Sequence, residues 1–153
     1  MPRFATAITK RWKKLRFTTF AVGPPDHRGE YRISHGDAQS FRHGIIYWSS
    51  RTGARELKVH ILNRYLDVGG PASSLGFPTS GMSLAPHGGR KAFFEHGGIW
   101  WSGHGAFVLT GSILDQYNAL HGAAGRLGYP ISDVHKVAGG ERADFEHGSL
   151  TAG

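Results

Sequence analysis

The chain repeats itself at a spacing of about 52 residues, and this limits its possible folds more than any other feature. A turn sequence occurs three times, as Leu-Gly-Phe-Pro at residues 75–78, as Leu-Gly-Tyr-Pro at residues 127–130 and, more weakly, as Val-Gly-Pro-Pro at residues 22–25. A second motif, Phe-X-His-Gly, begins 18 or 19 residues after the start of each turn, at Phe41, Phe94 and Phe145. Two motifs in one register predict three copies of a single structural unit.

Each copy also contains an apolar pattern typical of one helix face. Residues at positions i, i+1, i+4 and i+7 correspond between copies: Ile8, Thr9, Trp12 and Leu15, then Ile61, Leu62, Tyr65 and Val68, then Ile113, Leu114, Tyr117 and Leu120. This spacing places the four side chains of each copy on one side of a short helix. Glycines at 69–70 and 122 follow the second and third patterns, as expected where a helix ends.

The Phe-X-His-Gly motif predicts a β-hairpin turn, because β-favouring residues flank the His-Gly pair and glycine suits a turn with positive φ. With only 153 residues, the chain is expected to form one α+β domain. It would contain three tandem units of about 51 residues (7–54, 55–106 and 107–153), each a short helix, a turn and a β-hairpin. Segments such as residues 81–89 are expected to be loops. Leu75 and Phe77 are expected to enter the core.

Positive charge gathers near the start of the chain. The 18 lysines and arginines exceed the 11 acidic residues by seven, and six of these bases occur before residue 17: Arg3, Lys10, Arg11, Lys13, Lys14 and Arg16. Clustered charge attracts polyanions, which makes Lys10 to Arg16 a candidate polyanion-binding segment. The alternative is a solvated helix face. Nucleic-acid binding is disfavoured, because packing on the next unit better explains Trp12 and Leu15.

The sequence contains no catalytic signature. It has no cysteine, which excludes a disulfide scaffold, a thiolate zinc site and a cysteine nucleophile. The nucleophile-elbow, phosphate-loop and dinucleotide motifs are also missing. Glu95 and Glu146 occupy equivalent positions on separate units, a poor arrangement for a glycosidase pair, and are expected to pair at the surface with arginines such as Arg90 or Arg142. We therefore expect no enzyme, no catalytic residue and no cofactor.

No stretch of the sequence predicts a membrane span or a secretory signal. A span requires about 18 consecutive apolar residues, and no window reaches that length. A secretory signal would place an uninterrupted apolar run after its basic region, whereas residues 1–20 interleave basic and apolar residues.

These motifs, in this order, resemble the LGFP repeat family. Residues 75–80, 88–90, 94–102, 105–106 and 113–122 are similar to one full repeat, and shorter matches surround Phe41 and residues 127–133. The resemblance implies blades arranged pseudo-symmetrically, propeller-like or toroidal, in a module that binds an actinobacterial cell-wall glycan such as arabinogalactan. It also implies a location at the cell wall or the extracellular surface. Because the family usually has more units, another chain is expected to complete the core, which favours a homo-oligomer.

Two aromatic pairs, Tyr47-Trp48 and Trp100-Trp101, are the candidate glycan-binding residues. Successive side chains on a strand point to opposite faces, so one ring of each pair can enter the core while the other, expected to be the second, stays near the surface. An exposed ring can cover the apolar face of a sugar. The alternative is that both rings pack between units.

The hairpin histidines are further candidates. His43 and His96, with His147 in the third unit, could bond sugar hydroxyls. A histidine cluster that binds metal is disfavoured, because no further ligands occur at zinc-site spacings, and we expect no metal site.

Two functions remain open. The leading one is a non-catalytic module for cell-wall glycan. The alternative is a structural or assembly protein, for example a phage virion or tail component that docks on protein or cell wall. It is favoured by the lack of a visible signal and of an attached enzyme, and it would place the chain in a virion or in the cytoplasm.

Overall fold

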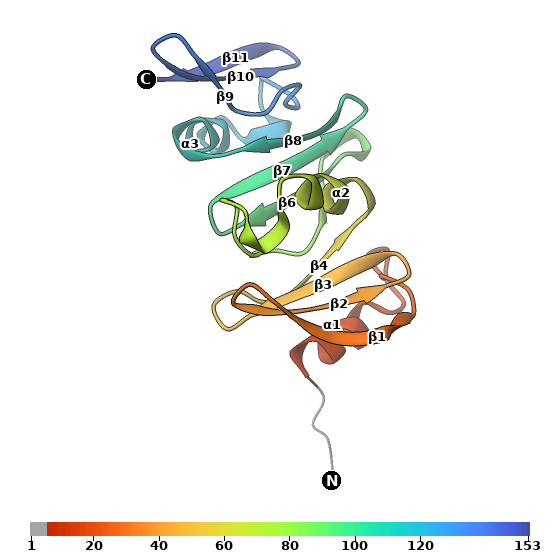
Figure 1. Ribbon diagram of the computed structural model, residues 1–153. Coiled ribbons are helices and arrows are strands. Elements are labelled where there is room, and N and C mark those ends of the chain that lie inside the picture. The colour runs from red at the N-terminus through yellow and green to blue at the C-terminus, as the bar shows by residue number, and fades with distance from the viewer. Residues whose placement is uncertain (1–5) are drawn as a thin grey trace.

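The computed structural model describes residues 6–153, which form a row of three antiparallel sheets and three helices (Figure 1). The helices are α1 (Ala7–Leu15), α2 (Val59–Asp67) and α3 (Gly111–Ala119). The first sheet contains β1 (Pro25–Ile33), β2 (Gly36–Phe41), β3 (Gly44–Ser49) and β4 (Gly53–Lys58). The second contains β5 (Ser83–Leu84), β6 (Arg90–Phe94), β7 (Gly97–Ser102) and β8 (Gly105–Leu109). The third contains β9 (His135–Val137), β10 (Gly140–Phe145) and β11 (Gly148–Ala152), and strands pair in chain order throughout.

The helices and hairpins lie where the repeat predicts them, but each hairpin belongs to a larger sheet. The segments before the hairpins, expected to be loops, supply the edge strands β1, β5 and β9. In the first two sheets β4 and β8 form the opposite edge. β4 also crosses the expected boundary between residues 54 and 55. Short or largely exposed edge strands need little apolar alternation, which is why the sequence pattern does not reveal them.

Two backbone hydrogen bonds join turn and hairpin in every unit. In the second unit the His96 N–H donates to the Leu75 carbonyl oxygen and the Glu95 N–H to that of Phe77, both at 3.0 Å. Equivalent bonds run from His43 to Val22 and Arg42 to Pro24, and from His147 to Leu127 and Glu146 to Tyr129. Because only backbone atoms take part, the weak Val-Gly-Pro-Pro copy keeps the same geometry. Gly76 makes the turn possible, since its φ is +75°.

An aromatic residue on each helix holds the same turn from the other side. Trp12 Nε1 donates to the Gly23 carbonyl oxygen at 2.8 Å, and the Tyr117 hydroxyl donates to that of Gly128 at 2.6 Å. The Tyr65 hydroxyl makes the equivalent bond to Gly76. Burial raises the pKa of Tyr65 and of Tyr117, so both hydroxyls stay protonated donors. The three positions matched by the sequence repeat are therefore one structural element used three times.

The units stack face to face, because α2 and α3 each lie between two sheets. One core joins the first sheet, α2 and the second sheet, and another joins the second sheet, α3 and the third. α1 covers the remaining face of the first sheet. The result is a row with the N-terminal and C-terminal units at opposite ends (Figure 1). The structure does not show the expected propeller-like or toroidal arrangement, because the three units stack in a row and do not close into a ring.

The outward face of the third sheet is polar. Thr151 stands where the first two sheets have Tyr47 and Trp100, and Arg142 Nε bonds Asp144 Oδ1 at 2.7 Å on the same face. Terminal faces of stacked repeats are typically polar in this way. This face therefore gives no support to the expectation that another chain completes the core there.

Candidate functional site

The two aromatic pairs divide between core and surface. Tyr47 and Trp100 are 1% and 2% exposed, whereas Trp48 and Trp101 are half-buried. Tyr47 packs edge-on against Tyr65 with centroids 5.3 Å apart, and Trp100 packs in the same way against Tyr117 at 5.2 Å. Tyr47 and Trp100 are therefore wrong as glycan-binding candidates, because the helix of the next unit covers them.

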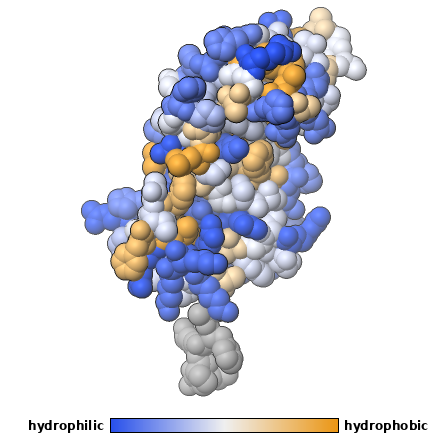
Figure 2. Space-filling view, turned by 180° about the vertical axis from the view of Figure 1, so that it is seen from behind, coloured by the Kyte–Doolittle hydropathy of each residue, from blue (hydrophilic) through white to orange (hydrophobic). Residues whose placement is uncertain are grey.

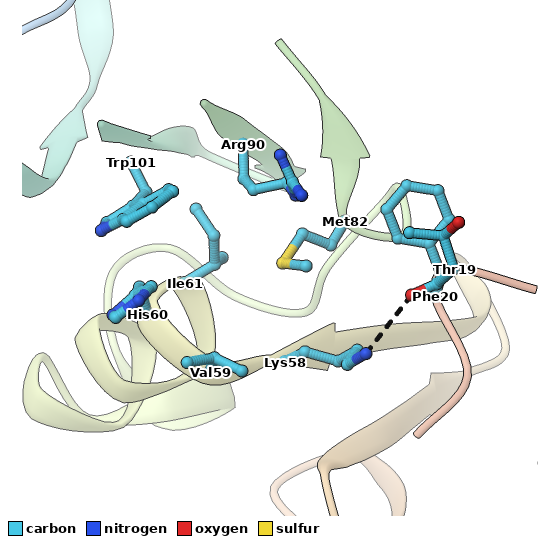
Figure 3. Close-up of a pocket in the computed structure, with 9 residues that line it drawn as sticks. All are labelled: Thr19, Phe20, Lys58, Val59, His60, Ile61, Met82, Arg90 and Trp101. Atoms are coloured by element: carbon cyan, nitrogen blue, oxygen red, sulfur yellow. Dashed lines mark hydrogen bonds between the residues drawn. The ribbon is translucent and has the colours of Figure 1, made fainter. Parts of the chain in front are cut away.

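Trp101 lines a cleft of about 270 Å³ between the first two units (Figure 3). Ile61 and Met82 are its buried apolar lining residues, and Phe20 lies at the end away from Trp101. Three basic side chains also line it: Lys58 from the end of β4, His60 from the start of α2 and Arg90 from β6. We call this site the basic cleft.

Each basic side chain has a defined neighbour. The His60 ring stacks on Trp101, with centroids 4.4 Å apart and an interplanar angle of 6°, so it covers one face of the indole. Arg90 Nη1 donates to the carbonyl oxygens of Gly88 and Gly89, both at 2.9 Å. Lys58 Nζ donates to the Thr19 carbonyl oxygen at 3.4 Å. Carbonyl oxygens thus hold Lys58 and Arg90, and within residues 6–153 no salt bridge compensates either charge.

Trp48 occupies the equivalent position in the first unit but lies in a hollow of opposite charge. Asp37 is the cross-strand partner of Trp48, as Arg90 is that of Trp101. The hollow beside Trp48, of about 180 Å³, is lined by Glu30 and Asp37. We call it the acidic hollow. The third unit has Ala152 at this position and so offers no ring.

Val59 opens α2 at the rim of the basic cleft in a strained conformation. Its φ is +43°, a value that β-branched residues rarely adopt. The equivalent residue of the third unit is Gly111, with φ +61°. The second unit therefore has valine at a position of positive φ, where the third unit has glycine, the residue that tolerates this conformation.

Val59→Gly is expected to raise the free energy of unfolding by about 1 kcal/mol, because relief of backbone strain outweighs the added freedom of the unfolded chain. Urea unfolding followed by circular dichroism measures the change. Val59→Ala is the matched control, since it keeps a Cβ at positive φ and should gain less. A glycine variant no more stable than the alanine variant would contradict the strain.

The predicted polyanion segment is only partly available. Lys10, Lys13, Lys14 and Arg16 are exposed on or beside α1. Arg11 is not, because its Nε and Nη2 bond the two oxygens of buried Glu56 at 2.7 and 3.1 Å. Arg11 is therefore a structural residue, and its assignment to polyanion binding is wrong. Arg3 lies outside the described residues.

Among residues 6–153, one highly exposed aromatic ring was not predicted from the sequence. Phe17 follows the basic helix and is 91% exposed. Figure 2 shows many hydrophilic side chains at the end of the row near the N-terminus, interrupted by small hydrophobic patches.

The hairpin histidines do not gather at one place. His43, His96 and His147 are exposed at the turns of three different sheets. Within residues 6–153, no three His, Cys, Asp or Glu side chains lie together as metal ligands. Across the same residues, no helix combines the length and apolarity needed to cross a membrane.

Glu95 and Glu146 hold turns rather than arginines. Glu95 Oε1 accepts the Phe77 N–H at 2.9 Å, and Glu146 Oε1 accepts the Tyr129 N–H at 2.7 Å. The Tyr129 N–H lowers the pKa of Glu146. The expected pairing with Arg90 or Arg142 is therefore wrong, because a backbone donor of the turn lies within reach of each carboxylate.

A family model described as LGFP repeat matches residues 28–73 and 75–125 in tandem, more than half of the chain. The first match begins within β1 and the second at the turn before β5, and each ends after the helix that follows its sheet. No curated protein matches the chain.

Proposed function

The chain belongs to the LGFP repeat family, and from that premise we propose that it is a non-catalytic module that binds a cell-wall glycan of the arabinogalactan kind. The supporting observation is the basic cleft, in which the half-buried Trp101 ring lies beside hydrogen-bond donors over an apolar lining. Saccharides are recognised by this combination of an aromatic ring and a few placed polar groups. On this proposal the protein acts at the cell wall or the extracellular surface.

The lining of the basic cleft supports binding rather than reaction. Its residues include no carboxylate, so they offer no acid and base pair for glycoside hydrolysis. Among the described residues its only hydroxyl belongs to Thr19, and no side-chain base makes a hydrogen bond to that hydroxyl, so it is a weak nucleophile.

Trp101→Ala is expected to weaken retention on isolated actinobacterial cell walls or on arabinogalactan by about tenfold or more, because the substitution removes the indole ring that contacts the sugar. Co-sedimentation at several protein concentrations measures retention. Trp48→Ala is the matched control, since it removes the equivalent ring from the acidic hollow, and each variant is first shown by circular dichroism to be folded. Wild-type retention by a folded Trp101→Ala variant would remove the basic cleft from the proposal.

A structural or assembly role, such as that of a phage virion component, is favoured by a different feature. Phe17 is almost fully exposed, with the Arg16 guanidinium 5.2 Å from its ring centroid, and an exposed ring next to a charge suits contact with another protein. The same sedimentation assay separates the two functions. Under the assembly role Phe17→Ser abolishes retention and Trp101→Ala does not.

A further inference from the structure

We infer that the basic cleft takes an acidic saccharide, one that carries a carboxylate or phosphate substituent. This inference rests on the proposed function and narrows it, because it places in the cleft a sugar of the wall glycan that carries an acidic substituent rather than a neutral arabinose or galactose unit.

The first argument is the charge of the cleft. Lys58, His60 and Arg90 come from three different elements and face one concave space (Figure 3). No acidic residue lines that space, and within residues 6–153 no salt bridge joins any of the three to a carboxylate. Cations gathered in a concave wall focus their field on whatever enters it.

The second argument is the apolar lining. Ile61 and Met82 are buried and lie between Arg90 and Lys58 in the view of Figure 3, and the rings of Phe20 and Trp101 lie at opposite ends. Low polarity around a charge strengthens its attraction to an opposite charge. A sugar ring with an acidic group uses both features, since its C–H surface can contact the aromatic and apolar side chains while the acid meets Lys58 and Arg90. A free inorganic anion would leave the apolar surface unused.

The third argument is the contrast with the acidic hollow. Glu30 and Asp37 stand there at the positions that Met82 and Arg90 occupy in the second unit, as the strand pairings show. The same architecture thus carries opposite charge in the two units, so the fold does not dictate the charge of the basic cleft. Charge that differs between equivalent sites is a means of distinguishing ligands.

The test compares ligands that differ only in charge. Trigalacturonate and its fully methyl-esterified form share one skeleton, and mannose 6-phosphate with mannose supplies the phosphate arm. Isothermal titration calorimetry is expected to show at least one acid binding about tenfold more tightly than its neutral partner, because charge-assisted hydrogen bonds are the stronger ones. The difference should shrink as salt is raised. The probe pair with the larger difference in affinity shows whether the cleft prefers a carboxylate or a phosphate.

Variants then assign the effect to the cleft. Lys58→Met and Arg90→Gln are each expected to reduce affinity for the acid about tenfold while leaving affinity for the neutral partner unchanged. Lys58→Arg keeps the charge and should retain binding. Asp37→Asn, in the acidic hollow, is the matched control and should change nothing.

Equal binding of the acid and its neutral partner would overturn the inference and leave glycan binding in place. If neither small probe binds, retention on cell walls decides, and retention unchanged in the Lys58→Met, Arg90→Gln double variant also overturns the inference. Loss of retention in that variant supports it. If the unmodified chain is not retained on walls or arabinogalactan at all, the proposed function fails, and the inference fails with it.

Discussion

Phe77→Ala is expected to lower the free energy of unfolding by about 3–5 kcal/mol, a large share of the stability of a domain of this size. The Phe77 ring is 4% exposed and belongs to the core that joins the first sheet, α2 and the second sheet. It lies against Gly36 of the first sheet, where an added Cβ would come within 2.7 Å of the ring. The resulting cavity lies between two sheets and can collapse only partly. The free energy of unfolding is therefore expected to fall by the amount typical of an unfilled buried cavity.

The third unit repeats this contact and provides a comparison. The Tyr129 ring lies in the same way against Gly89, which directly precedes β6 and is equivalent to Gly36, and the Tyr129 hydroxyl donates to the Pro86 carbonyl oxygen. Tyr129→Ala should therefore cost a similar amount, whereas Tyr129→Phe should cost only the hydrogen bond, about 1 kcal/mol. Urea unfolding with an unchanged slope measures each loss. A loss below about 1 kcal/mol for Phe77→Ala would mean that the ring does not hold the units together.

The repeated elements could be predicted because each carries its signal locally. One aromatic position per helix, Trp12, Tyr65 and Tyr117, recurs with the apolar spacing of a helix face, and all three bond the glycine of the turn. The turn and hairpin motifs likewise specify backbone conformation through glycine and proline, which act within a few residues. Strand alternation places Trp48 and Trp101 on the faces opposite Tyr47 and Trp100. Their half-buried state depends on packing as well, since Ile46 and Ile99 on the same faces are fully buried.

Apart from Trp101, the residues of the candidate site could not be predicted, because they meet only through the stacking of the sheets. Lys58, His60 and Arg90 are ordinary polar residues in the sequence, and they share a cleft because the first sheet, α2 and the second sheet pack together. One signal was available: aligning the units shows that the cross-strand partner of the repeated tryptophan changes from Asp37 to Arg90. The stacking of the units in an open row could not be predicted either, since repeat spacing does not specify whether repeats close into a ring.

Arg11 shows the same limit for a single residue. In the sequence Arg11 is one of several clustered basic residues, and nothing there distinguishes it from those that are exposed. Its partner Glu56 lies 45 residues away on β4, and only the packing of α1 on the first sheet brings the two together.

Arg11→Met is expected to lower the free energy of unfolding by about 3–5 kcal/mol, because it leaves the carboxylate of Glu56 buried without its ion-pair partner. Glu56 is 1% exposed, and both of its oxygens accept bonds from Arg11. Arg11→Met with Glu56→Val should recover most of the loss, since a buried ion pair can be replaced by apolar side chains at little cost. Lys14→Met, an exposed base on the same helix, is the control and should cost about 0.5 kcal/mol or less.

The second and third units suggest a sharper form of this experiment. Arg64, the equivalent of Arg11, pairs with Asp133, whose position corresponds to Gly81, while Val108 stands at the position of Glu56. A Cβ at Gly81 would lie 2.0 Å from Glu56 Oε2, so glycine there leaves room for that carboxylate. The two junctions thus keep one arginine and one carboxylate but supply the carboxylate from different elements.

Moving the carboxylate from position 56 to position 81 should therefore preserve an ion pair with Arg11. Glu56→Val alone leaves Arg11 without its acid, and Gly81→Asp alone crowds two carboxylates into one space, so each single variant should unfold more readily than the natural chain. Together they recreate the Arg64 arrangement, and the double variant should be more stable than either single one, with a coupling of about 2 kcal/mol in a double-mutant cycle. Strictly additive losses would show that Arg11 does not accept a carboxylate from position 81, and that the equivalence of the two junctions does not extend to their charges.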